Sequence, residues 1–219
     1  VRGKKGTQVK LQLRRGEETL DFSVYRKEIQ TIVASGTMLE GNVGLITIYN
    51  FDERCAEETI QAIKTLQTNG AGKLIFDVRY NPGGYAHELV ELLDYLLPEG
   101  DLFRTVDYRG KENVDRSDAA CLETPIAVLV NDGSYSAAEF FAAALKEYDA
   151  AVIIGEQTVG KGYFQTTYQL SDGSAVALSI GKYFTPKGVS LAENGITPDV
   201  VVPVDEETAS GIYYGLLED

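Results

Sequence analysis

Short apolar segments alternate with segments of helical periodicity between residues 45 and 154, and this alternation constrains the fold more than any other feature. The apolar runs that have the length of buried strands are Leu45–Tyr49, Leu74–Val78, Ile126–Val130 and Ala151–Ile154. Amphipathic helices are predicted at 52–69 and 86–97, and an alanine-rich helix begins near Ser136. Strands that alternate with helices form βαβ crossovers. We therefore predict an α/β fold with a mainly parallel sheet flanked by helices.

The remaining segments add antiparallel structure at both ends of this core. Near the N-terminus, residues 8–14 and 20–24 alternate polar and apolar side chains around a turn, which predicts a two-stranded hairpin. A lone hairpin is marginal in water, so it indicates a chain that begins partway through a domain. A second hairpin is predicted around Ser171-Asp172-Gly173, as an antiparallel pair added late to the sheet. Residues 200–204 are predicted to be extended, and the last residues to form a short helix.

Composition excludes several classes of function. With 219 residues and 44% hydrophobic residues, the chain can bury one main core with a small appendage. The net charge of −13 argues against nucleic-acid binding, which needs a basic patch. Cys55 and Cys121 lack metal-ligand spacing, so no metal site is predicted, while a disulfide stays open. No apolar run reaches the length of about 20 residues that spans a bilayer. Any signal or membrane anchor would therefore lie outside this sequence.

Ser136 is placed where a buried strand passes through a turn into a helix. Such a position exposes the hydroxyl at the sheet edge, beside the free N–H groups of the helix start. The residue is therefore a candidate nucleophile. The sequence Ser136-Ala-Ala-Glu139 also fits a capping box, in which the serine only caps the helix. The sequence leaves both interpretations open, and they are compatible with each other.

A serine nucleophile needs a base, and the chain offers two candidates. Its single histidine, His87, lies on the polar face of a predicted helix four residues before Glu91, as expected for a surface pair. Lys161 is held between two glycines after a core strand, with apolar neighbours and with Gln165 four residues on. A lysine acts as a base only where desolvation disfavours its ammonium form. Lys161 is the preferred base, with Gln165 to orient it, although an ordinary turn lysine has the same pattern.

A second glycine-rich turn supplies candidate oxyanion donors. Gly83 and Gly84 follow one core strand and precede a helix, so their amides are expected at the same sheet edge as Ser136. An oxyanion hole needs two such donors. The amide of Ala137 and that of either glycine would provide them, although Asn81-Pro-Gly-Gly84 also fits an ordinary strand-to-helix turn.

Several sequence blocks in order resemble the C-terminal processing, or tail-specific, proteases of the S41 serine peptidase family. The resemblance runs from about Gly44 to Val204. Its motifs are Asp77-Val-Arg-Tyr-Asn-Pro-Gly-Gly84, Ser134-Tyr-Ser-Ala-Ala-Glu139, Gly155-Glu-Gln-Thr-Val-Gly-Lys-Gly-Tyr-Phe-Gln165, Leu170-Ser-Asp-Gly-Ser174, Tyr183-Phe-Thr-Pro-Lys-Gly188 and Asn194-Gly-Ile-Thr-Pro-Asp199. Tyr135 departs from the small residue common in the family, and Glu147 stands where an aspartate can occur.

The resemblance implies a serine endopeptidase that cleaves polypeptides near their C-termini. Ser136 would be the nucleophile, Lys161 the base and Gln165 the residue that positions the lysine. Gly83, Gly84 and Ala137 would form the oxyanion hole, with Glu139 and Thr158 in support. No cofactor is expected.

The resemblance also implies an architecture and a setting. Residues 35–219 would form a crotonase-like or ClpP-like protease core, and residues 1–34 the C-terminal remnant of a PDZ domain. The expected partners are polypeptides with accessible C-terminal tails, and a homo-oligomer is compatible with the family. The expected location is extracytoplasmic, in the bacterial periplasm or at the cell surface. Two other functions stay open: a catalytically silent module that binds C-terminal peptides, and a hydrolase that uses His87 as its base.

Overall fold

A computed structural model describes residues 1–29, 31–118, 120–205 and 208, and the chain divides into two units, Val1–Ile32 and Val33–Asp219. The first unit is a hairpin of strands β1 (Gln8–Arg15) and β2 (Glu18–Tyr25), which confirms the predicted antiparallel pair. The helix predicted for the last residues lies outside the described part of the chain.

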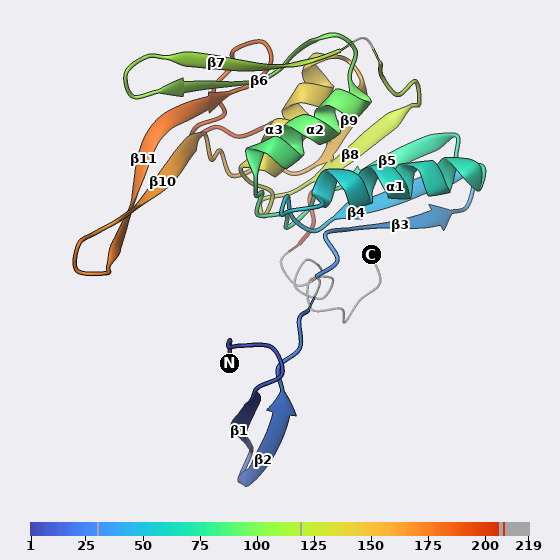
Figure 1. The fold of residues 1–219 in the computed structure, drawn as a ribbon. Coiled ribbons are helices and arrows are strands. Elements are labelled where there is room, and N and C mark those ends of the chain that lie inside the picture. Colours follow the sequence, from blue (N-terminus) through green and yellow to red (C-terminus); the bar gives the residue numbers. More distant parts are fainter. Residues whose placement is uncertain (30, 119, 206–207, 209–219) are drawn as a thin grey trace. The chain divides into compact units, whose positions relative to one another are not determined.

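The second unit is built on a six-stranded sheet in the order β12-β9-β8-β5-β4-β3 (Figure 1). Its strands are β3 (Ala34–Leu39), β4 (Val43–Ile48), β5 (Lys73–Asp77), β8 (Ile126–Val130), β9 (Ala151–Gly155) and β12 (Val200–Val201). All neighbours pair in parallel except β3, which runs antiparallel along β4. The mainly parallel sheet is therefore confirmed. Strand β3 was not predicted, because Ala34–Leu39 carries neither a clear alternation nor an apolar run.

Three helices connect the parallel strands: α1 (Cys55–Thr68), α2 (Ala86–Leu96) and α3 (Ala137–Glu147). The strand order advances in one direction along the sheet, so right-handed crossovers place successive helices on the same face. Burial agrees with this arrangement. One cross-strand row faces the helices and is 0% exposed at every position; it consists of Ile46, Phe76, Val128 and Ile153.

The opposite face of the sheet is less covered than the sequence suggests. The neighbouring cross-strand row of Leu45, Ile75, Ala127 and Val152 is half-buried or exposed. The apolar residues of Leu74–Val78 would suit a strand covered on both faces, but Ile75 is only half-buried. A single layer of helices is the physical reason.

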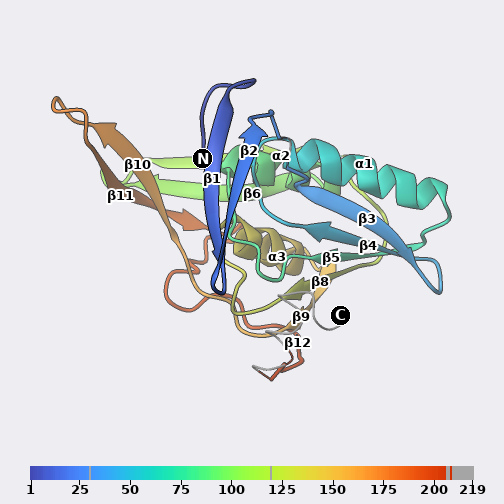
Figure 2. The same cartoon turned by 90° about the horizontal axis from the view of Figure 1, so that it is seen from below.

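A second sheet contains four antiparallel strands in the order β10-β11-β6-β7. They are β6 (Gly100–Asp107), β7 (Glu112–Ser117), β10 (Tyr163–Gln169) and β11 (Ala175–Phe184). The late hairpin thus forms as predicted, but it pairs with the β6–β7 hairpin and not with the parallel sheet. The views in Figures 1 and 2 show the β10–β11 ribbon extending away from the helices.

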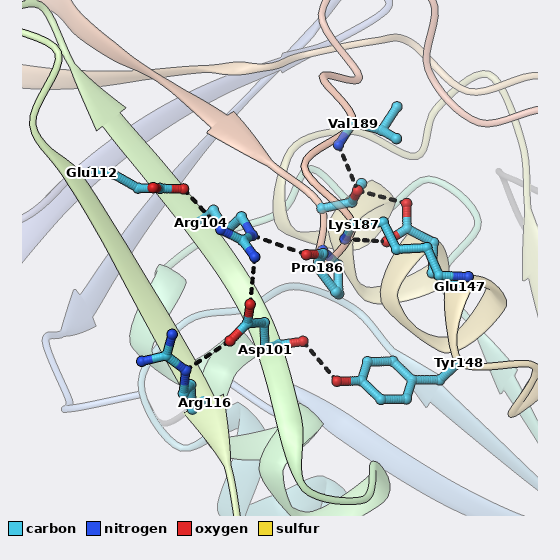
Figure 3. A network of polar contacts seen from close by, with 10 residues as sticks. Asp101, Arg104, Glu112, Arg116, Glu147, Tyr148, Pro186, Lys187 and Val189 are labelled. Carbon is cyan, nitrogen blue, oxygen red and sulfur yellow. Dashed lines mark hydrogen bonds and ion pairs between the residues drawn. The ribbon is translucent and has the colours of Figure 1, made fainter.

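Charged side chains fasten this second sheet to the segment after β11 (Figure 3). Arg104 pairs with Asp101 and Glu112 and donates a hydrogen bond to the carbonyl of Pro186, with Nε at 2.9 Å. On the other side of that segment, Glu147 accepts hydrogen bonds from Thr185 Oγ1 at 2.6 Å and from the Lys187 N–H at 2.8 Å. The polar contacts with this segment join residues far apart in the sequence, so no periodicity in the sequence predicts them. Aromatic packing also joins this sheet to α3, because Phe140 contacts Phe103 and Tyr183.

The two cysteines are both free, which settles the disulfide left open by the sequence. Cys121 is exposed, and burial raises the pKa of the Cys55 thiol to about 12. Among the described residues, no helix has the length and apolar character needed to cross a membrane. The same part of the chain contains no cluster of three or more potential metal ligands.

Gly155 at the end of β9 provides a test of the sheet register. Its φ is +129°, and a Cβ atom there would lie 2.0 Å from the carbonyl oxygen of Val130 on β8. We expect Gly155→Ala to lower the free energy of unfolding by at least about 2 kcal/mol, measured by urea denaturation. Gly72→Ala is the control, because a Cβ there meets no atom within 4 Å. Equal stabilities of the two variants would contradict the register.

Asp199 gives a prediction for the pH dependence of stability. The hydrogen bonds from Lys146 and from the Ile153 N–H hold the pKa of its carboxyl below the usual range. Because the folded pKa is lower than the unfolded one, the ionised group stabilises the fold at neutral pH, and this contribution is lost as the pH falls through the folded value. We expect Asp199→Asn to lower the melting temperature at pH 7, with the difference from wild type shrinking below about pH 4. Asp132→Asn, the control at an exposed turn carboxylate, should change neither the melting temperature at pH 7 nor its dependence on pH.

Candidate active site

Ser136 occupies the N-cap of α3 in a strained backbone conformation. Its φ of 59° and ψ of −125° lie in a region that residues with a side chain rarely adopt. Ser134 stabilises this turn: it is fully buried, and its hydroxyl donates a hydrogen bond to the carbonyl of Val78 at 2.7 Å. Tyr135 donates its N–H to the carbonyl of Asn81 at 3.1 Å. Strain maintained by surrounding hydrogen bonds is characteristic of functional positions.

The glycine turn after β5 packs directly against Ser136. A Cβ atom at Gly83 would lie 2.7 Å from Ser136 Cβ and 2.8 Å from the Ala137 nitrogen, so only glycine fits there. Gly84 is equally confined, because a Cβ there would lie 2.4 Å from the carbonyl of Phe51. The structure therefore brings the two glycine-containing turns together at one sheet edge, as the sequence predicts.

The amides at this junction are not equivalent. The Gly83 N–H donates to Asn81 Oδ1 at 2.8 Å, so Asn81 already occupies it. Within the described residues, the Gly84 and Ala137 N–H groups have no hydrogen-bond acceptor. Both residues border a small pocket of about 10 Å³ beside Ser136, the size of about one water. Of the three predicted oxyanion donors, Gly84 and Ala137 are the pair that is free to act.

The Glu139 carboxylate is completely buried and connects the serine turn to the lysine loop. Oε2 accepts the N–H of Ser136 at 2.9 Å and that of Lys161 at 2.9 Å. Oε1 accepts the Thr158 hydroxyl at 2.6 Å and the Gly160 N–H at 2.6 Å. Ser136 and Glu139 also form the predicted capping box. The cap and the connection to the lysine loop are therefore made by one residue.

Neither Lys161 nor Gln165 forms a hydrogen bond with the serine among the described residues. The Lys161 side chain is exposed, and its Nζ lies over the Tyr135 ring, 5.5 Å from the centroid. Within the described residues, Nζ makes no hydrogen bond with Ser136 Oγ or with Gln165. Gln165 is exposed on β10. The burial predicted for Lys161 is thus not observed, because its loop lies on the surface, where the ammonium lies over the Tyr135 ring.

His87 lies apart from this group. Its side chain is 67% exposed, stacks on the Tyr85 ring at 5.3 Å, and approaches Glu88 rather than the predicted Glu91, with Nε2 at 3.6 Å from Oε1. Glu88 in turn accepts the N–H groups of Arg54 and Ala56 at the start of α1. The arrangement is that of a surface histidine.

Two buried asparagines support the site, and sequence reasoning assigned no role to either. Asn81 Nδ2 donates to the carbonyl of Ile48 at 2.6 Å while Oδ1 accepts from Gly83. Asn131 Oδ1 accepts the N–H groups of Tyr80 and Gly133 at 2.9 and 3.1 Å. Each asparagine directly follows or opens a strand-end turn, which was the available signal, since asparagine side chains commonly bond the backbone of their own turns.

The comparisons with known proteins agree with one another. Residues 42–202 match the model of peptidase family S41. The chain is 39% identical over 203 residues to the carboxy-terminal processing protease CtpA of Bacillus subtilis, covering 91% of this chain and 44% of that protein. It is 31% identical over 230 residues to the chloroplastic carboxyl-terminal-processing peptidase 2 of Arabidopsis thaliana, covering 100% and 45%. The chain thus spans less than half the length of these relatives.

A solved structure extends the likeness to the fold. The photosystem II D1 C-terminal processing protease superposes with a TM-score of 0.72 at 30% sequence identity. The match covers 94% of this chain and 59% of that one. The mixed α/β architecture with a mainly parallel sheet is accordingly that of S41 protease structures.

The Glu139 carboxylate is the feature of this site that is easiest to test. Glu139→Gln keeps the size but places an amide donor among N–H groups that need acceptors, so we expect a loss of about 2–4 kcal/mol in unfolding free energy. The loop 156–163 should also become more susceptible to limited proteolysis. Glu91→Gln makes the same chemical change on an exposed face of α2 and should alter neither. Wild-type stability of Glu139→Gln would show that the four hydrogen bonds are not important.

Proposed function

We propose that this chain, which belongs to peptidase family S41, is the protease core of a serine endopeptidase that cleaves polypeptides near their C-termini. The observation that carries the proposal is the strained Ser136 at the start of α3, bound through Glu139 to the backbone of Lys161. Strain costs free energy, and a serine that served only as a helix cap would gain nothing from it. The relatives named as C-terminal processing proteases support the class of substrate.

In the proposed mechanism, Ser136 Oγ attacks the scissile carbonyl carbon while neutral Lys161 takes the hydroxyl proton. The resulting oxyanion is held by the amides of Ala137 and Gly84, aided by the positive end of α3. Protonated Lys161 then gives its proton to the leaving amine, and the acyl-enzyme forms. Water, deprotonated by the same lysine, attacks the ester and releases Ser136. Every step uses side chains and amides of this chain, and none calls for a cofactor.

This mechanism requires Lys161 to leave the Tyr135 ring and approach Ser136. The backbone of Lys161 is already fixed by Glu139, so the change is confined to the lysine side chain. A bound polypeptide would cover the exposed ammonium and remove water from it, which favours the neutral base. Gln165 would then orient the amine without adding charge. The position over Tyr135 is accordingly the resting position of the base.

The remaining assignments rest on the family. We propose that residues 1–34 are the end of a PDZ domain and that residues 35–219 form the protease core. The division of the chain between Ile32 and Val33 supports that boundary. Polypeptides with accessible C-terminal tails are the proposed partners, in an extracytoplasmic location, and self-association is compatible with the family.

The dyad is tested by substitutions assayed on an unfolded protein such as β-casein and on a short activated ester. We expect Ser136→Ala and Lys161→Ala each to reduce kcat by a factor of about 10³ or more, because nucleophile and base act as a unit. His87→Ala should change kcat less than about twofold. A loss of activity in His87→Ala would instead favour a histidine base. Wild-type turnover in Ser136→Ala would exclude Ser136 as the nucleophile, and no turnover in the wild type on either substrate would favour the silent peptide-binding module.

A further inference from the structure

We propose that the free edge of strand β10 binds the substrate, as an extended polypeptide that adds a strand to the second sheet. This inference rests on the proposed protease function and extends it from the reacting atoms to the substrate main chain. Strand β10 (Tyr163–Gln169) is the outermost strand in the order β10-β11-β6-β7. It begins two residues after Lys161, so a peptide paired with it would lie beside the base.

Two hydrogen bonds establish which backbone groups of β10 are free. At the root, the Tyr183 N–H donates to the Gly162 carbonyl at 2.8 Å, and at the tip the Leu170 N–H donates to the Ser174 carbonyl at 2.8 Å. Antiparallel pairing alternates, so the even-numbered residues between them direct their backbone groups toward β11. Tyr163, Gln165, Thr167 and Gln169 therefore direct their N–H and C=O groups outward. Those groups form a regular template for one more strand.

The edge lacks the charged residues and prolines that often protect an exposed strand. Sequence Tyr163–Gln169 contains no charged residue and no proline. By contrast β7, at the other edge of the same sheet, carries Glu112, Asp115 and Arg116. Unprotected edges are a liability in proteins unless they bind something. An uncharged edge is suited to a partner whose side chains vary, because main-chain hydrogen bonds do not depend on sequence.

A pocket on the Tyr163 face of the sheet would take a side chain of the bound strand. It has a volume of about 310 Å³, and its apolar lining is provided by Val106, Tyr108, Tyr163, Ile180 and Phe184. Lys182 Nζ lies over the Tyr163 ring, 5.4 Å from the centroid, and forms part of the same lining. A strand paired with β10 places alternate side chains on this face. The expected substrate is thus an extended polypeptide with an apolar residue at this position.

The position of the ribbon agrees with this role. Beyond Gln165, strand β11 pairs with β10 alone, because its contacts with β6 are confined to Gly181–Phe184. The ribbon consequently stands out from the rest of the unit (Figure 1). Tyr168, Leu170 and Leu178 are 45%, 48% and 49% exposed on it. A bound strand would cover the edge along this ribbon and continue toward Ser136.

The test uses a proline that removes one outward N–H without breaking the hairpin. Thr167→Pro does so, since the Thr167 N–H faces away from β11 and proline is tolerated at such edge positions. We expect KM for β-casein to rise about tenfold, the effect of losing one main-chain hydrogen bond in the complex. Hydrolysis of the short activated ester, which does not reach β10, should change less than about twofold.

The matched control makes the same backbone change on the opposite edge of the sheet. Val114 lies on β7, and the Asp107 N–H to Lys111 carbonyl bond at 3.0 Å places the Val114 N–H outward. Val114→Pro should leave KM for β-casein unchanged. If Thr167→Pro still hydrolyses the ester and its KM for β-casein is unchanged, the proposal that substrate pairs with β10 is wrong, while the proposed protease function stands. Absence of ester hydrolysis in the wild type would instead overturn the protease.

Competitor peptides test the same edge in the unaltered protein. Two extended apolar peptides of one sequence are N-methylated at alternate residues, one at the odd and the other at the even positions. Only one of these sets can face β10 in a paired strand, so we expect their inhibition constants for β-casein cleavage to differ by about tenfold or more. Equal inhibition by the two would contradict strand addition, even if Thr167→Pro proved unstable.

Discussion

The buried Glu139 carboxylate is the interaction on which the arrangement of the site depends. Its two oxygens accept four hydrogen bonds, from Ser136, Thr158, Gly160 and Lys161. A buried carboxylate is costly unless all its acceptor capacity is used, so the loop 158–161 is drawn onto the start of α3. Thr158 extends the effect, because its hydroxyl also accepts the Ile196 N–H at 2.8 Å. One charge thus positions three separate segments.

The topology explains why these segments meet at all. The serine turn and the glycine turn follow adjacent parallel strands, β8 and β5, so they leave the sheet at the same edge. Gly83 can approach Ser136 closely because β5 and β8 are direct neighbours and no other strand lies between them. The lysine loop arrives by a different path, from β9 to β10, and therefore links the parallel sheet to the antiparallel one.

Local features of the site could be predicted from the sequence, and long-range ones could not. Ser136 and Glu139 are three residues apart at the start of one helix, and Asn81-Pro-Gly-Gly84 is a continuous turn motif, so both patterns are visible in a short stretch. The placement of Lys161 over Tyr135 and the hydrogen bond from Asn81 Nδ2 to the Ile48 carbonyl depend on how separate segments pack. The same holds for β3 and for the second sheet, where Asp101–Ser117 is largely polar and Arg104 donates a hydrogen bond to a carbonyl 82 positions away.

The division of the site between two sheets also connects binding to catalysis. Backbone hydrogen bonds to Glu139 fix the Gly160–Lys161 end of the loop, whereas the Lys161 side chain and the edge of β10 remain exposed. A strand that paired with β10 would lie along the residues that follow Lys161 directly and would shield its ammonium from water. Desolvation favours the neutral amine, which is the form that accepts the serine proton. Substrate binding at the edge would therefore itself help to convert the resting lysine into a base, so that the site becomes active when a chain is in position to be cut.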